Sequence, residues 1–208
     1  MRRWTLSYSL MHRSTCSIRI GRVVVSESAE RYRRVAAGFT RRVSAIHGDA
    51  WSLPAPCAGW VASDIVRHLV DWVPPFLADG AGVTLAVGPS VDTDPVAAWL
   101  SLSDGIQSLL DDPDQATRSF DHPQAGRHPL DDAVMTFILT DVLIHTWDLA
   151  RATGLDETLE VAEVVRMFDG IHEVDAILRE SGEYGPKIEV ATDADVQTQL
   201  IAFLGRRP

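Results

Sequence analysis

Residues 141–154 read DVLIHTWDLARATG, and this stretch decides how the chain folds. It continues an apolar run that starts at Ala133 and is interrupted by two threonines and Asp141. A helix that is apolar nearly all round is normally buried, and a carboxylate inside it costs free energy unless a partner stabilises its charge. Asp141 and His145 are four residues apart, so they lie on one face of a helix. The stretch therefore predicts a buried helix with a carboxylate–imidazole pair, and a shared metal ion would offset the cost of burying it.

His68 is the third candidate metal ligand. It shares one face of a predicted helix, 61–73, with Ile65 and Trp72. A histidine that meets an Asp141–His145 pair from another helix leaves coordination positions open, as catalytic metal sites do. Imidazole and carboxylate ligands suit zinc, nickel, iron and manganese. The alternative is an Asp–His ion pair without metal, with His68 as an ordinary core histidine.

Other polar side chains near this pair have two interpretations each. Asp148 either orients His145 through a hydrogen bond or serves as a surface or capping acid. Arg151 either contacts an anionic substrate or pairs with a nearby acid. Cys57 is interpreted as a structural thiol, since the sequence shows no base or partner for it.

The remaining aromatic and histidine residues are weaker candidates. Trp60 and Trp72 are expected to be core aromatics, and either can form the wall of a pocket. His172 is the best substitute if one of the three proposed ligands is wrong, because it lies at helical spacing from Phe168 and Asp175. The other histidines are expected to be solvated or to follow a helix end: His47, His122 and His128.

Helical periodicity recurs along the rest of the chain. Apolar residues repeat at helical intervals in six segments: 27–46, 61–73, 94–111, 131–153, 161–178 and 194–204. Pro74-Pro75 is expected to end or kink the second helix, because proline removes a hydrogen bond and clashes with the preceding turn. The polar stretch 112–130 is expected to be a long crossover that can contain a short hairpin, and 185–190 a short extended piece. The sequence thus predicts an all-α bundle with decorations.

The first predicted helix shows the periodicity most clearly. Its apolar stripe comprises Ala29, Tyr32, Val35, Ala36, Phe39, Val43 and Ile46. Its solvated positions are expected to include Arg31, Arg34, Arg41 and Arg42.

Composition limits the classes of protein that fit this chain. Its 208 residues suit one domain with a sizeable core, and the net charge of −10 disfavours nucleic acid as a partner. All 29 acidic residues lie beyond residue 25, whereas five of the 19 basic residues precede it. We interpret 1–24 as a disordered tail or a misassigned start, and 25–208 as a single domain. Two cysteines and no uninterrupted apolar run of about 18–20 residues favour a cytoplasmic protein that does not enter a membrane.

Three motifs resemble one known family. Residues 51–69, with Pro54, Cys57, Trp60 and His68, are similar to the front of the mycothiol-dependent maleylpyruvate isomerase metal-binding domain. Residues 141–154 match the second signature of that family. The tail, with Tyr184-Gly185-Pro186 and residues 202–206, resembles the closing piece of an actinobacterial subgroup of unassigned function.

The resemblance implies a fold and a metal site. The wider DinB/YfiT-like superfamily is expected to form a four-helix bundle with a divalent metal at one end of its core. Carried over onto this chain, the ligands are His68, Asp141 and His145, with zinc the first choice and nickel, iron or manganese as alternatives. Homodimers are also expected from the relatives.

Three departures limit what the resemblance implies. The isomerase has a glutamate where this chain has Asp141, which is shorter by one methylene. Relatives usually have a capping threonine where this chain has Val61, and we expect Ser63 to be able to cap instead. The isomerase also has a further C-terminal domain, whereas only 28 residues follow Glu180 here. Maleylpyruvate isomerisation itself is therefore not transferred.

Two classes of function follow from the sequence. The first is a metal-dependent isomerase or S-transferase that joins mycothiol, or another low-molecular-weight thiol, to a small electrophilic molecule. A metal-bound thiol loses its proton and becomes a nucleophile at neutral pH. The second is a non-catalytic helical bundle that acts as a binding or regulatory module.

Overall fold

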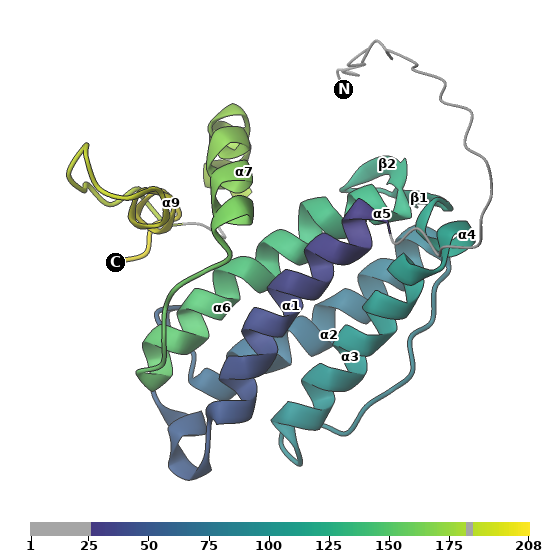
Figure 1. The fold of residues 1–208 in the computed structure, drawn as a ribbon, viewed down its shortest axis with the longest axis horizontal. Helices are drawn as coiled ribbons and strands as arrows, with labels where there is room; N and C mark the ends of the chain where they lie inside the picture. The colour runs from purple at the N-terminus through teal and green to yellow at the C-terminus, as the bar shows by residue number, and fades with distance from the viewer. Residues whose placement is uncertain (1–25, 182–184) are drawn as a thin grey trace, which may run out of the picture.

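The computed structural model describes residues 26–181 and 185–208 (Figure 1). The interpretation of 1–24 as a tail, and Tyr184 of the closing motif, lie outside the described residues. The first part of the described chain contains α1 (Glu27–Ala45), η1 (Gly48–Ser52), α2 (Ala62–Ala81), α3 (Pro95–Asp111) and α4 (Pro113–Ala116). The second part contains β1 (Ser119–His122), β2 (Gly126–Pro129), α5 (Leu130–Ala133), η2 (Val134–Leu139), α6 (Thr140–Thr153), α7 (Val161–Ile171), η3 (His172–Val174), α8 (Asp175–Ser181) and α9 (Val196–Phe203).

Helix α1 forms where its periodicity predicts. The Ser26 side chain caps it by accepting a hydrogen bond from the Ala29 amide, and the whole predicted apolar stripe is buried. The expectation that Arg42 is solvated is wrong. Its guanidinium is buried and donates to the carbonyls of Asp156 and Thr158, because the chain beyond α6 crosses this end of α1. Arg31 is also largely covered, through an ion pair with Glu163.

Helix α2 continues through Pro74 and Pro75 and ends at Ala81, which corrects the predicted end near Val73. Each proline removes a backbone hydrogen bond, but the last two turns bury Leu77 and Gly80 against the rest of the molecule, and this packing offsets the loss.

The start of α2 also differs from expectation. Val61 occupies the N-cap position, and its amide donates to the Asp64 carboxylate. This hydrogen bond pairs the Val61 amide at the start of the helix. Asp64, rather than Ser63, therefore provides the capping interaction.

The crossover between the third and fourth long helices contains the short hairpin that its composition allows. Strands β1 and β2 pair antiparallel, with Ser119 opposite Pro129 and His122 opposite Gly126. Phe120 is fully buried under the hairpin, against the end of α2. The hairpin is the one sheet in the described part of the chain, so the all-α class holds in the coarser sense of a mostly helical protein.

The predicted helix 131–153 is formed by α5, η2 and α6 in one continuous helical run. Its middle turn, η2, is a π-helix, and Gly154 ends the run in the left-handed conformation with φ of 69°. Among the described residues, Leu130–Thr153 is the one helix long and apolar enough to cross a membrane by length and composition. However, 78% of its most apolar window is buried inside the molecule, as in the core helix of a soluble protein.

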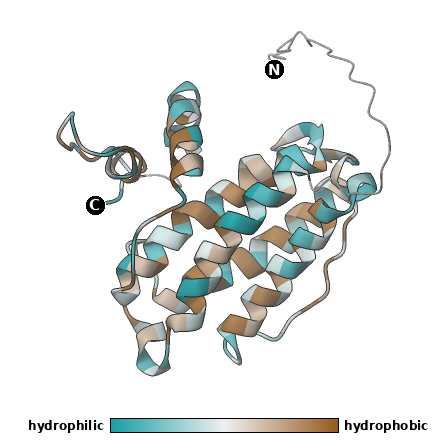
Figure 2. Ribbon diagram, in the orientation of Figure 1, coloured by the Kyte–Doolittle hydropathy of each residue, from teal (hydrophilic) through white to brown (hydrophobic). Residues whose placement is uncertain are grey.

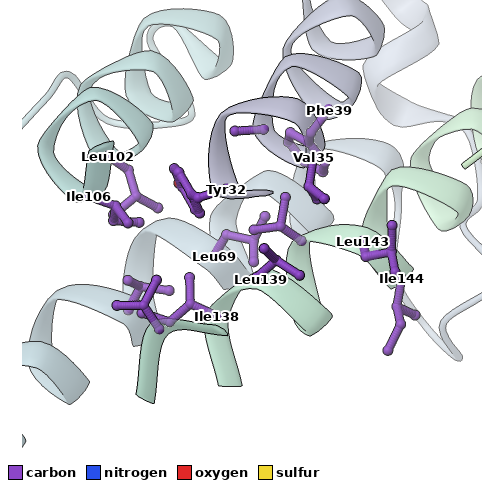
Figure 3. Close-up of a cluster of buried hydrophobic side chains, with 14 of the residues drawn as sticks. Tyr32, Val35, Phe39, Leu69, Leu102, Ile106, Ile138, Leu139, Leu143 and Ile144 are labelled. Carbon is purple, nitrogen blue, oxygen red and sulfur yellow. The ribbon is translucent and has the colours of Figure 1, made fainter. Parts of the chain in front are cut away.

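The long helices share one core. Helices α1 and α2 each pack against both α3 and α6 (Figure 1), and most helices carry hydrophilic and hydrophobic residues along their length (Figure 2). Figure 3 shows buried side chains from all of them meeting, including Tyr32 of α1, Leu69 of α2, Ile106 of α3 and Leu143 of α6. This packing fixes the relative position of α2 and α6, from which the candidate site is built.

The C-terminal part forms a small helical unit beside these helices (Figure 1). Helix α7 packs against α9, and the predicted helix 161–178 is confirmed as helical, with the 3₁₀ turn η3 interrupting it. The expected extended piece 185–190 contains no regular strand; the Ile188 amide donates to the Ala202 carbonyl. After α9 the chain turns at Gly205, with φ of 82°, and brings Arg206 back toward α6.

Candidate metal centre

Helices α2 and α6 bring the three predicted ligands together. His68 Nε2 lies 3.1 Å from Asp141 Oδ2, and His145 Nε2 lies 3.3 Å from Asp141 Oδ1. One ligand atom from each residue fits within 4.8 Å of the others. The two imidazoles therefore face one carboxylate, the arrangement that the i, i+4 spacing and the facing histidine predicted.

The π-helical turn η2 lies immediately before the residues of this cluster. A π-turn adds one residue, which rotates the following helix by about 100° relative to an uninterrupted α-helix. The direction in which Asp141 and His145 leave α6 therefore depends on η2 as well as on the sequence of α6 itself.

The cluster is buried on the α6 side and open on the α2 side. Side-chain exposure rises from 6% for His145 to 20% for Asp141 and 33% for His68. A ligand can therefore approach from the side of His68 and Asp141.

Two tryptophans form walls of the cluster. The Trp72 indole donates to Asp141 Oδ2 over 2.9 Å. The Trp60 ring lies 5.2 Å from the His68 ring and 5.8 Å from the His145 ring, between centroids. Both tryptophans are partly exposed and pack against the core. Their position fits the interpretation as walls beside the cluster better than the interpretation as fully buried core aromatics.

Asp148 contacts the His145 ring at Nδ1, the nitrogen that does not face Asp141. Its side chain is fully buried, and Oδ2 lies 2.9 Å from His145 Nδ1. This contact confirms the first interpretation of Asp148 and rules out a surface acid. Because Nδ1 donates to the Asp148 carboxylate, Nε2 is the nitrogen left facing Asp141, and it is the atom that would bind a metal once it has lost its proton.

Asp148 has a further partner that sequence reasoning missed. The Arg206 guanidinium donates to both of its oxygens, over 2.7 and 2.8 Å. The Cys57 thiol lies 3.5 Å from Asp148 Oδ2 and 3.9 Å from Arg206 Nη2, so it has partners that the sequence did not reveal. Cys57, His145 and Asp148 also form a second group of potential metal ligands, but the bidentate arginine already occupies the carboxylate.

The charges of this network shift its pKa values. Burial opposes ionisation of Asp141, but the charge and hydrogen bonds of His145 and His68 outweigh it and hold the Asp141 pKa well below its usual range. Burial also opposes protonation of His145, but Asp141, Asp148 and Cys57 raise its pKa well above the ordinary value. Hydrogen bonds from His145 and Arg206 lower the pKa of Asp148 in spite of its burial.

The remaining candidates lie elsewhere. The exposed His172 packs edge-on against Phe168 and Phe203 and does not belong to the cluster, so it does not replace a ligand. Arg151 pairs with Glu157 and lies over the Trp147 ring, which confirms the second interpretation of this arginine.

Fold and site together describe a mostly helical protein with a histidine–carboxylate cluster between two core helices. The family model for the mycothiol maleylpyruvate isomerase N-terminal domain matches residues 32–150, which include all three clustered residues, and the chain belongs to this family. This confirms the resemblance of residues 51–69 and of the first part of 141–154, whereas the tail motif lies beyond the matched residues.

Two curated relatives match most of the chain. They are the uncharacterized proteins MT0763 and Rv0738 of Mycobacterium tuberculosis, from strains CDC 1551 and H37Rv. Each is 25% identical over 189 residues, covering 84% of this chain and 95% of the relative. No solved structure matches the chain significantly.

Proposed function

We propose that the protein binds one divalent metal ion through His68, Asp141 and His145 and uses it in a thiol-dependent reaction. The reaction is an isomerisation or an S-transfer on a small electrophilic molecule, with mycothiol or another low-molecular-weight thiol as cosubstrate. The observation that carries the proposal is the convergence of two imidazoles on one partly exposed carboxylate between α2 and α6. Membership of a family named for a mycothiol-linked isomerase supports the choice of thiol.

The three proposed ligands offer nitrogen and oxygen donors, which suit a divalent transition metal of intermediate softness. Two imidazole nitrogens and a carboxylate oxygen suit zinc best, with nickel, iron or manganese as alternatives. Three protein ligands leave room for a thiol or water, and a bound divalent ion would lower the pKa of that group. Asp148 holds the His145 ring through Nδ1, while Trp60 and Trp72 lie against the cluster.

We also propose a four-helix bundle as the architecture, a single domain and a cytoplasmic location. Helices α1, α2 and α3 and the run from α5 to α6 are assigned to the DinB/YfiT-type four-helix bundle, on the basis of their mutual packing. Residues 25–208 are assigned to one domain. A cytoplasmic location, a small-molecule substrate and a homodimer remain predictions.

A second function is supported by one observation. Every buried side-chain nitrogen and oxygen in the described part of the chain has a hydrogen-bond partner without a metal. The cluster can therefore exist as a self-satisfied ionic network, as expected for a non-catalytic binding module.

The experiment that separates the two functions measures turnover. Zinc-loaded protein is incubated with mycothiol and either maleylpyruvate, for isomerisation, or monochlorobimane, for S-transfer. We expect turnover of one electrophile, loss of it in His145→Ala, and retention in His47→Ala, which changes an exposed histidine outside the cluster. Full metal occupancy without turnover of either electrophile would favour the binding module.

A further inference from the structure

Helix α1 carries five arginines, and two of them differ from the others. Three have partners inside the molecule: Arg31 with Glu163, Arg33 with Glu30 and Asp111, and Arg42 with the carbonyls of Gly38, Asp156 and Thr158. Arg34 and Arg41 make no hydrogen bond or ion pair with any residue in 26–181 or 185–208. Both side chains are exposed, so in this acidic chain their two guanidinium groups are available to an anionic ligand from solvent.

Both arginines line the same cavity. It has a volume of about 190 Å³ and lies between α1, α6 and the connection that follows α6. None of His68, Asp141 and His145 lines it, so it is separate from the candidate metal centre. Its volume is below the several hundred Å³ of typical drug-sized pockets, which limits the occupant to a small molecule.

Gly38 opens the floor of this cavity. Arg34, Gly38 and Arg41 follow each other at i, i+4 and i+7, so they lie on one face of α1. A Cβ at position 38 would lie 3.7 Å from Arg42 Nη1 and 3.9 Å from Arg41 Nη2. The absent side chain therefore leaves space directly beside two guanidinium groups.

The two acids of the lining are already engaged. Asp156 accepts a hydrogen bond from the Thr158 amide, and its Oδ2 lies 3.5 Å from Arg42 Nη2. Its interaction with Arg41 is electrostatic, without a hydrogen bond or ion pair. Glu160 caps α7 by accepting from the Glu163 amide. Three arginines against two acids leave the lining with a net positive charge.

The rest of the wall combines three apolar side chains, Val35, Leu143 and Leu159, with two threonines, Thr146 and Thr158. We propose that the cavity binds a small organic carboxylate with a short apolar chain, with Arg34 and Arg41 holding its carboxylate. Guanidinium groups present paired donors that match the two oxygens of a carboxylate, and they lose less hydration than ammonium groups do. Val35, Leu143 and Leu159 then contact the apolar chain of the ligand.

Nuclear magnetic resonance titration of the metal-free, isotopically labelled protein with pentanoate tests this site. We expect saturable shifts at the Gly38 amide and at the Arg34 and Arg41 side chains. The Arg34→Gln/Arg41→Gln variant should bind at least tenfold more weakly, and Gly38→Ala, which fills part of the floor, should also bind more weakly. Arg127→Gln removes the same kind of charge from the exposed hairpin and should bind as the wild type does.

Several results would overturn the site. These are the absence of saturable shifts, an unchanged affinity in the double variant, or tighter binding of inorganic phosphate than of pentanoate. Binding that requires the metal-loaded protein would also overturn it, because the ligand would then be at the metal centre. The outcome is independent of whether the metal centre is catalytic, since the titration uses metal-free protein.

Discussion

Arg206 is the residue that ties the chain's last turn to the candidate metal centre. It meets both oxygens of the buried Asp148, which in turn fixes the imidazole of His145. We expect Arg206→Ala to lower metal affinity by about 10–100-fold, as the loss of such supporting partners does. It should also lower the free energy of unfolding by about 1–3 kcal/mol, because a buried carboxylate loses its partner.

The measurement is a metal dissociation constant from competition with a chromogenic chelator, beside urea unfolding. Arg206→Lys keeps the charge without the two-pronged geometry and should give an intermediate affinity. Arg207→Ala, at the exposed neighbouring residue, is the control and should match the wild type. An Arg206→Ala variant with reduced stability but unchanged metal affinity would show that Arg206 supports the fold alone.

The same network predicts how stability depends on pH in the metal-free protein. The lowered pKa values of Asp141 and Asp148 contribute stability that is present above the unfolded-state value of about 3.9 and lost as pH falls through the folded-state values. The raised pKa of His145 contributes stability that is complete below about 6.5 and lost as pH rises through its folded-state value. The free energy of unfolding should therefore be greatest between about pH 4 and 6.5.

Urea unfolding between pH 3 and pH 9 checks this, with metal removed beforehand. His145→Gln should lack most of the decline on the alkaline side. If wild type and variant declined equally there, the stabilising charge would not reside on His145.

At the residue scale, the sequence predicts local pairs better than distant ones. Asp141 and His145 are found by helical spacing, and His68 by the face it shares with Trp72. Cys57 and Arg206 are 91 and 58 positions from Asp148, and no periodicity connects them. The family resemblance of the tail was the one signal that included Arg206, but it gave no role for it.

At the scale of single elements, the end of α2 depends on its contact with the hairpin. Gly80 lies under Phe120, and a Cβ there would stand 2.1 Å from the Phe120 ring. We expect Gly80→Ala to lower the free energy of unfolding by about 1–3 kcal/mol, as overpacking does. Chemical denaturation measures the change.

Gly170→Ala is the matched control, since this helical glycine of α7 has open space around its Cβ position. It should be neutral or stabilise the protein by up to about 1 kcal/mol, through helix propensity. If both variants had the same effect, helix propensity rather than the Phe120 contact would determine the cost.

Element boundaries could be predicted where local chemistry sets them, and not where tertiary contacts do. Local chemistry sets the start of α3, where the Asp94 side chain accepts from the Ala97 amide, and the end of α6, where Gly154 is left-handed. Pro74 and Pro75 signal an end that packing overrides. The π-helical turn η2 has no distinct sequence signal, although it determines how the cluster residues leave α6.

At the scale of the whole molecule, the four long helical segments hold the cluster and the C-terminal segment completes it. The family match covers residues 32–150, so it includes His68, Asp141 and His145 but not Arg206. The core that positions the cluster thus lies within the family's domain. The arginine that meets both oxygens of Asp148 lies beyond the match.

Metal content tests the central claim most directly. Untagged protein, purified without chelators, is analysed by elemental mass spectrometry beside His68→Ala and the exposed-site control His47→Ala. The proposed site predicts one divalent ion per chain, lost in His68→Ala and kept in His47→Ala. Absence of metal even after reconstitution, or full occupancy in His68→Ala, would contradict it.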